Sequence, residues 1–173
     1  MVEFESRPYG PEYEDPVGRL FESSDFCYRT TIPMTLGHAD IRRLAAGSRV
    51  VLADGLPVGL WSVDSLLWSA AGQDVHSGLY LLHLRLASFV PVEWWRAVYR
   101  RVLDHLRDRQ EVARISFEVN EFDLLGQDVA EALGLRAEGL LPDLVERDGR
   151  RWGRWTYGAV WPVAAPAGRR GDW

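Results

Sequence analysis

The apolar run GLYLLHLRLAS, residues 78–88, constrains the fold more than any other stretch of this sequence. Its near-continuous apolar character is typical of a central strand that is covered on both faces. Residues 91–106 follow, with apolar side chains at helical spacing and arginines on the other side, and then a short buried run, ARISFEV, at 113–119. A strand, a long helix and a second strand in this order indicate a layered α/β domain.

The remaining patterns add strands and helices on both sides of this unit. Two hairpins are expected, at 48–64 and 143–161, because Asp54-Gly55 and Asp148-Gly149 tolerate the positive φ angles of tight turns. We also expect a strand near 26–33, and helices near 36–46 and from about 123 to Gly134. The predicted fold is one mixed sheet with helices on its faces.

The chain of 173 residues is long enough for one domain. Prolines interrupt residues 1–24, which we expect to form an arm or an irregular cover. Residues 25–162 then form the domain, and 163–173 have the composition of a loose tail.

Composition excludes several classes of function. All 20 basic residues are arginine, so a Schiff-base lysine mechanism is excluded. With 25 acidic residues the net charge is -5, and because no basic stripe stands out, nucleic acid is not an expected partner. One cysteine and four histidines without ligand-like spacing predict no metal site. No apolar run approaches the ~18 residues that span a bilayer, and the acidic N-terminus is unlike a signal peptide, so we expect a cytoplasmic protein.

The stretch RISFEVNEFDLLGQDVAEALGLRAEGLLPDLVERDGRRWGRW resembles the C-terminal half of the GNAT N-acetyltransferase superfamily. That superfamily repeats a strand, a helix ending in leucine-glycine-aromatic, and an arginine-x-glutamate-glycine step. Here the last two elements are 133–135 and 136–139. The hairpin VVLADGLPVGLW also resembles the second and third strands of the superfamily. The resemblance implies a single GNAT-like domain in which the two central strands, 78–88 and 113–119, are splayed and admit acyl-coenzyme A.

Several residues of these strands become candidate site residues through this resemblance. Glu118, in an otherwise apolar strand, and His83, in the middle of the first strand, are the candidates for the base that deprotonates an amine. Each also has a structural interpretation: His83 as a core histidine, and Glu118 as a carboxylate held ionised by an arginine such as Arg85. The resemblance further implies that backbone N–H groups between His83 and Ala87 hold the donor and its oxyanion. This set of donor-binding candidates comprises Leu84, Arg85, Leu86 and Ala87.

The sequence departs from the superfamily where the coenzyme pyrophosphate would bind. Glycines before the long helix let the backbone close on phosphates at a helix N-terminus, but no glycine lies between Gly78 and Gly126 here. Alignment places Glu93 and Trp95 at the glycine positions, where a carboxylate and bulky indoles disfavour an anion. The tyrosine with which the superfamily protonates the leaving thiolate is replaced as well, by Ala130.

Two functions follow from these observations. The first is an acyltransferase for a small-molecule amine or a protein N-terminus, with an atypically bound donor, either acyl-coenzyme A or a pantetheine thioester on an acyl carrier protein. The alternative is a GNAT-like protein that has lost acyl transfer and binds an apolar or aromatic ligand or a protein partner, or performs other chemistry in the same cleft. Eight tryptophans favour an aromatic cleft, and a homodimer is left open. The candidate aromatics are Trp94 and Trp95 at the donor, and Trp61, Trp155 and Tyr157 at the substrate.

Overall fold

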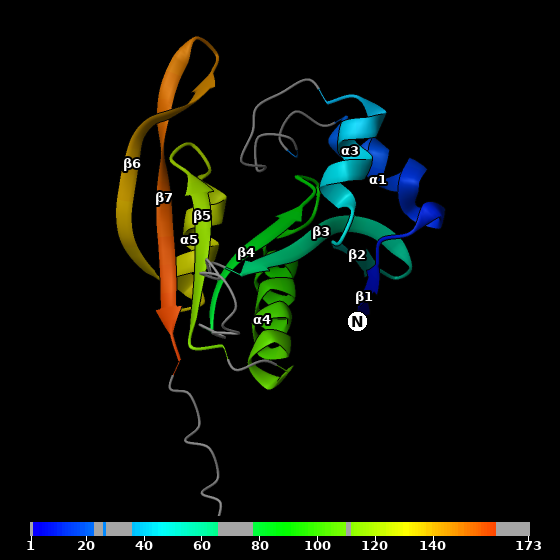
Figure 1. The fold of residues 1–173 in the computed structure, drawn as a ribbon, viewed down its shortest axis with the longest axis horizontal. Helices are drawn as coiled ribbons and strands as arrows, with labels where there is room; N and C mark the ends of the chain where they lie inside the picture. Colours follow the sequence, from blue (N-terminus) through cyan, green and yellow to red (C-terminus); the bar gives the residue numbers. More distant parts are fainter. Residues whose placement is uncertain (1, 23–25, 27–35, 66–77, 110–111, 162–173) are drawn as a thin grey trace, which may run out of the picture.

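The computed structural model describes residues 2–22, 26, 36–65, 78–109 and 112–161. The predicted tail and all but one residue of the strand expected at 26–33 lie outside these ranges. The described chain folds into a single domain around one open, mixed sheet of seven strands (Figure 1). In spatial order the strands are β1 (Phe4–Pro8), β2 (Arg49–Ala53), β3 (Leu56–Ser65), β4 (Leu79–Leu86), β5 (Arg114–Asn120), β7 (Arg150–Val160) and β6 (Arg136–Arg147).

A β4–α4–β5 unit forms the middle of the sheet, as the apolar runs predict. β4 and β5 are parallel neighbours, while every other pair of strands is antiparallel. A parallel pair needs a crossover, and the long helix α4 (Val92–Arg109) provides it. β4 and β5 pair only from Leu79–Arg114 to Leu82–Phe117. Beyond these pairs the two strands diverge, so the expected splay is confirmed.

Helices cover both faces of the sheet (Figure 1). α4 and α5 (Leu124–Ala132) lie on one face and are joined by an ion pair between Arg96 and Asp128. α1 (Glu14–Phe21) and α3 (His38–Ala45) pack together on the other face, with α1 against β3. This second pair explains why Val50 and Leu60 are as deeply buried as the residues facing α4.

Residues 2–22 are more regular than their sequence suggests. β1 pairs with β2 along the edge of the sheet, and a single 3-10 turn (Pro11–Tyr13) leads into α1. Of the expected arm or irregular cover, the irregularity is not found in residues 2–22, because three prolines occupy permitted positions. Pro8 ends a strand, Pro11 opens the 3-10 turn, and Pro16 lies in the first turn of α1, where no intrahelical N–H is required.

The turn and cap predictions are confirmed. Asp54 and Gly55 have φ angles of 48° and 81° between β2 and β3, and Asp148 and Gly149 have 54° and 70° between β7 and β6. Asp123, where the helix was expected to begin, caps α5: its side chain accepts the N–H of Gly126, at 3.0 Å.

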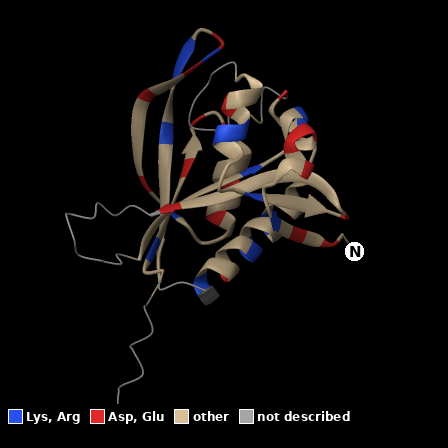
Figure 2. Ribbon diagram, turned by 45° about the vertical axis from the view of Figure 1, so that its right-hand side comes forward, with Lys and Arg blue, Asp and Glu red and all other residues tan. Residues whose placement is uncertain are grey.

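One continuous apolar core connects the helices on both faces with the sheet. Acidic and basic residues are scattered over the described ribbon without a long stripe of either sign (Figure 2). Within the described ranges, no helix is long and apolar enough to cross a membrane.

Candidate functional site

The splay between β4 and β5 is the centre of the candidate site. β4 continues for four residues beyond its last pair with β5, to Leu86, and β5 continues for three, to Asn120. Over these residues the facing edges of the two strands are not joined by ladder hydrogen bonds. Backbone N–H and C=O groups that would otherwise be used by the sheet are therefore directed toward the splay.

Only part of β4 directs its backbone into the splay. The N–H of Ala87 donates to the carbonyl of Val58 in β3, at 2.8 Å. Because the direction of these groups alternates along an antiparallel strand, His83 and Arg85 also point to β3, while Leu84 and Leu86 point toward β5. Of the backbone N–H groups between His83 and Ala87, those of Leu84 and Leu86 therefore face the splay, and those of His83, Arg85 and Ala87 do not.

A tyrosine closes one side of the splay. The hydroxyl of Tyr99, on α4, donates to the carbonyl of Leu84 at 3.0 Å, and the Tyr99 ring packs edge-on against Phe117 of β5. Tyr99 is 2% exposed. Helix α4 therefore spans the two diverging strands through a buried side chain, and it seals the splay from its own face of the sheet.

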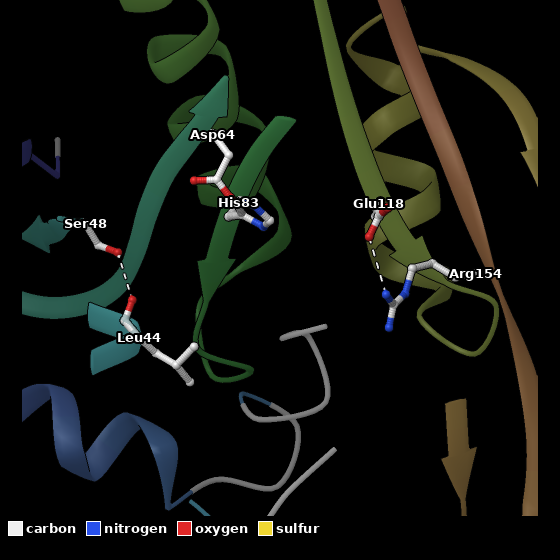
Figure 3. Close-up of polar contacts among 6 residues, drawn as sticks. All are labelled: Leu44, Ser48, Asp64, His83, Glu118 and Arg154. Carbon is white, nitrogen blue, oxygen red and sulfur yellow. Dashed lines mark hydrogen bonds and ion pairs between the residues drawn. The ribbon is translucent and has the colours of Figure 1, made fainter. Parts of the chain in front are cut away.

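His83 and Glu118 lie on the same face of the sheet, on the two strands that flank the splay. Phe117 packs against α4, so its neighbour Glu118 points to the opposite face. Trp61 packs against α4 and lies opposite Leu84, so the next residue along β4, His83, also points away from α4. Figure 3 shows His83 on one side of the splay and Glu118 on the other. The structure thus places both candidate bases on one face of the sheet, on the two strands that diverge.

Each candidate base has its own charged partner. The Nε2 atom of His83 lies 2.9 Å from a carboxylate oxygen of Asp64 on β3, and Asp64 is 70% exposed. Glu118 accepts a hydrogen bond of 3.4 Å from Arg154 of β7 (Figure 3). Arg154 is almost buried and also donates to the side chain of Asn120, at 3.1 Å. The arginine that accompanies Glu118 is therefore Arg154 rather than Arg85.

The two tryptophans that open α4 do not lie together at the splay. Trp95 is 1% exposed, donates its indole N–H to the carbonyl of Val90, and stacks on Tyr99. Trp94 is partly buried and meets the ring of Phe4 in β1 edge-on, at 5.4 Å between centroids. Because β1 lies at the far edge of the sheet, Trp94 points away from β5, and Trp95 belongs to the core.

The start of α4 lacks the features of a phosphate site. Pro91 directly precedes the first helical residue, and its carbonyl accepts the N–H groups of both Trp94 and Trp95. The exposed carboxylate of Glu93 lies in that first turn, where the positive end of the helix dipole attracts negative charge. The groups present therefore do not fit a pyrophosphate held by a glycine-rich loop.

The three aromatic residues expected at the substrate lie on the opposite face of the sheet from His83 and Glu118. Tyr157 lies opposite Phe117, and Trp155 opposite Val119, so both share the α4 and α5 side of the sheet, as does Trp61. Tyr157 donates to Glu131 of α5 at 3.3 Å. Burial, together with this carboxylate, raises the pKa of Tyr157.

Sequence reasoning missed Asp64 and Arg154. The Asp54-Gly55 hairpin predicts that Asp64 lies near the end of β3. Only the pairing of β3 with β4 then places it beside His83. Arg154 offers no such signal, because the run RRWGRW presents three arginines and only the pairing of β5 with β7 selects one. In the described part of the chain, no three His, Cys, Asp or Glu side chains cluster as metal ligands would.

Comparison with known proteins reveals fold similarity without close sequence relatives. No family model matches the chain, and no curated protein matches it. A GNAT-family acetyltransferase from Bacillus anthracis superposes with a TM-score of 0.67 at 14% identity, over 92% of this chain and 96% of that one. YncA of Salmonella typhimurium, a putative acetyltransferase solved with acetyl-CoA, gives 0.69 at 12% identity, over 96% and 98%.

The protein RimL, a ribosomal L7/L12 α-N-protein acetyltransferase solved with coenzyme A, gives a TM-score of 0.74. Its sequence identity to this chain is 12%, and the superposition covers 91% of this chain and 93% of RimL. These neighbours cover nearly the whole chain on both sides of the comparison. The chain therefore has the fold of the GNAT acetyltransferases.

Proposed function

We propose that this protein is an N-acyltransferase that moves an acyl group from a thioester to a primary amine, on a small molecule or a protein N-terminus. The observation that carries the proposal is the position of His83 and Glu118 on one face of the sheet, on either side of the point where β4 and β5 separate. The GNAT fold of the acetyltransferase neighbours supports the same reaction class.

The reaction needs a base and an oxyanion partner, and the splay offers both. The amine nitrogen attacks the thioester carbonyl, a C–N bond forms, the C–S bond breaks, and the sulfur leaves as a thiolate that takes up a proton. Glu118 removes the proton from the amine, while Arg154 orients the carboxylate. The N–H groups of Leu84 and Leu86 stabilise the negative charge on the carbonyl oxygen. His83, held by Asp64, is the second candidate base.

We expect the protein to bind the donor mainly through its thioester arm and less through its phosphates. The turn from Ala87 to Val90 is closed by a backbone hydrogen bond of 3.0 Å, and Glu93 adds negative charge beside it. A pantetheine arm on an acyl carrier protein brings no nucleotide pyrophosphate to this end of α4. We therefore favour a carrier-bound thioester over free acyl-coenzyme A.

The same turn favours a second candidate function, a GNAT-like protein without acyl transfer. If the start of α4 excludes all phosphate-bearing donors, the splay serves to bind an apolar or aromatic ligand or a protein segment. Donor binding separates the two functions, so the first experiment measures it.

The first test compares acetyl-coenzyme A with acetyl-pantetheine, which lacks the nucleotide, by tryptophan fluorescence and melting temperature. We expect acetyl-pantetheine to bind as tightly as acetyl-coenzyme A within a few fold. Glu93→Gln should then improve acetyl-coenzyme A binding by about 2-fold to 5-fold, since a helix-terminal charge contributes ~0.3–1 kcal/mol, and should leave acetyl-pantetheine unchanged. Asp104→Asn, exposed farther along α4, is the matched control and should change neither. Absence of stabilisation by both thioesters at millimolar concentration rejects acyl transfer.

The second test concerns the base. Glu118→Gln should lower the rate of amine acylation by about 100-fold or more, the usual contribution of a general base, with little change in donor binding. Glu146→Gln, an exposed glutamate of β6, is the control and should retain full activity. A full rate in Glu118→Gln together with a large loss in His83→Gln would transfer the role to His83.

A further inference from the structure

A groove lies between α4 and the outer strands β1, β2 and β3, on the face of the sheet opposite His83 and Glu118. Its volume is about 390 Å³, which is within the range of small-ligand sites. Phe4 and Val51 line it from the sheet, and Val98 and Val102 line it from the helix. The groove is separate from the splay, because β3 and β4 lie between β2 and β5.

A fixed indole forms one wall of the groove. Trp61 is 5% exposed, donates its Nε1–H to the hydroxyl of Ser6 at 2.8 Å, and meets the ring of His105 edge-on at 5.7 Å between centroids. The hydrogen bond and the ring contact hold Trp61 in one orientation. A flat, rigid aromatic wall beside valine side chains favours a planar apolar ligand group.

The charged lining of the groove is more basic than acidic. Arg49 is anchored by two hydrogen bonds to Ser6, from Nε to the hydroxyl at 3.0 Å and from a terminal nitrogen to the backbone carbonyl at 2.7 Å. Its guanidinium carbon lies 5.9 Å from the centre of the Trp61 ring. Arg101 extends from α4, and across the described ranges neither Arg49 nor Arg101 forms an ion pair with a carboxylate.

The acidic residues of the lining do not cancel this charge. Glu3 and Glu5 also line the groove, but Glu5 is engaged by Arg7 at 2.6 Å. Within the described lining, this leaves one carboxylate, that of Glu3, against the two arginines Arg49 and Arg101. An anion is the ligand group that this balance favours, and arginine forms forked hydrogen bonds to carboxylates.

We propose that this groove is a second ligand site and binds a small aromatic carboxylate. The ring lies against Trp61 and Phe4 between the valines, and the carboxylate meets Arg49 with Arg101 at the rim. The inference is independent of the acyl-transfer proposal, since it uses no residue of the splay.

The test uses 3-phenylpropionate, its neutral amide and 3-phenylpropylamine as probes, with binding measured by isothermal titration calorimetry and quenching of tryptophan fluorescence. We expect the carboxylate to bind with a submillimolar dissociation constant. The dissociation constants of the amide and the amine should be about tenfold higher or more, because a charge-assisted hydrogen bond is lost. Arg101→Gln should weaken carboxylate binding by about tenfold for the same reason.

The neighbouring residue provides the matched control. Arg100 is also exposed on α4 but does not line the groove, so Arg100→Gln should leave the carboxylate dissociation constant unchanged. Trp61→Phe, with folding checked by circular dichroism, should weaken all three probes alike. Tighter binding of the amine, equal binding by the Arg101→Gln and wild-type proteins, or no binding of the carboxylate at millimolar concentration would each overturn the proposal.

Discussion

The hydroxyl of Tyr9 is buried and has no hydrogen-bond partner among the described residues, and it gives the clearest stability prediction at the scale of a single residue. A buried polar group that has lost its water and gained no partner costs about 1–3 kcal/mol. Tyr9→Phe should therefore leave the free energy of unfolding unchanged or raise it by about 1 kcal/mol, measured by urea denaturation. Tyr157→Phe is the opposite control, because its hydroxyl donates to Glu131, and it should lose about 1 kcal/mol.

The pH dependence of this effect has a definite sign. Burial raises the pKa of Tyr9, so the phenol keeps its proton in the folded chain at a pH where it is ionised in the unfolded chain. With respect to this ionisation, the folded chain has its full stability below the unfolded pKa of about 10. It loses stability as the pH rises through the folded pKa. The advantage of Tyr9→Phe should grow above that pH, and a constant difference across the alkaline range would contradict this interpretation.

The residues of the candidate site differ in how far the sequence determines them. His83 and Glu118 could be selected from sequence because each is a polar residue inside an apolar strand. Their partners could not, because Arg154 reaches Glu118 only through the pairing of β5 with β7, which joins residues 36 apart. The two tryptophans show the converse: their adjacency predicts nothing about direction, since neighbouring residues on a helix point about 100° apart.

At the scale of an element, the contact between β3 and β4 depends on a glycine. A methyl group at Gly59 would overlap the carbonyl oxygen of Arg85 and the side chain of Leu86 in the neighbouring strand. Gly59→Ala should therefore lower the free energy of unfolding by about 1–3 kcal/mol, the usual cost of overpacking. A change in the urea midpoint measures it.

A second glycine provides the matched control for that substitution. Gly18 lies inside α1, and a methyl group there would meet nothing within 4 Å. Gly18→Ala should raise the free energy of unfolding by about 0.5–1 kcal/mol, because alanine loses less conformational entropy in a helix. Equal effects of the two substitutions would show that the packing around Gly59 is not the cause.

Elements with a strong periodic pattern were predictable, and elements built from mixed patterns were not. α4 and β4 follow from hydrophobic spacing alone, and both hairpins follow from an Asp-Gly turn. α1 was missed because its buried apolar residues, Val17, Leu20 and Phe21, span little more than one turn and directly follow Pro16. β1 was missed because an edge strand has half its backbone unpaired and needs no continuous apolar run.

At the scale of the whole molecule, the splay divides the sheet into two parts that share little ladder. β1 to β4 form one part, β5 to β7 the other, and four residue pairs join them. α4 compensates for this short junction: Tyr99 bonds β4 and packs on β5, and Arg96 pairs with Asp128 of α5. The separation of β4 from β5 thus coexists with one shared core.

Because the core is shared, we expect the two parts of the sheet to unfold together, as single domains of this size usually do. Ile115→Ala, a deletion at a fully buried position of β5, should cost about 2–5 kcal/mol. The loss should appear equally in the hydrogen exchange of amides in β2 and β3, far from the substitution, and in those of β5 and β7. If only the amides of β5 and β7 lose protection, the splay separates two independently unfolding units, and α4 does not couple them.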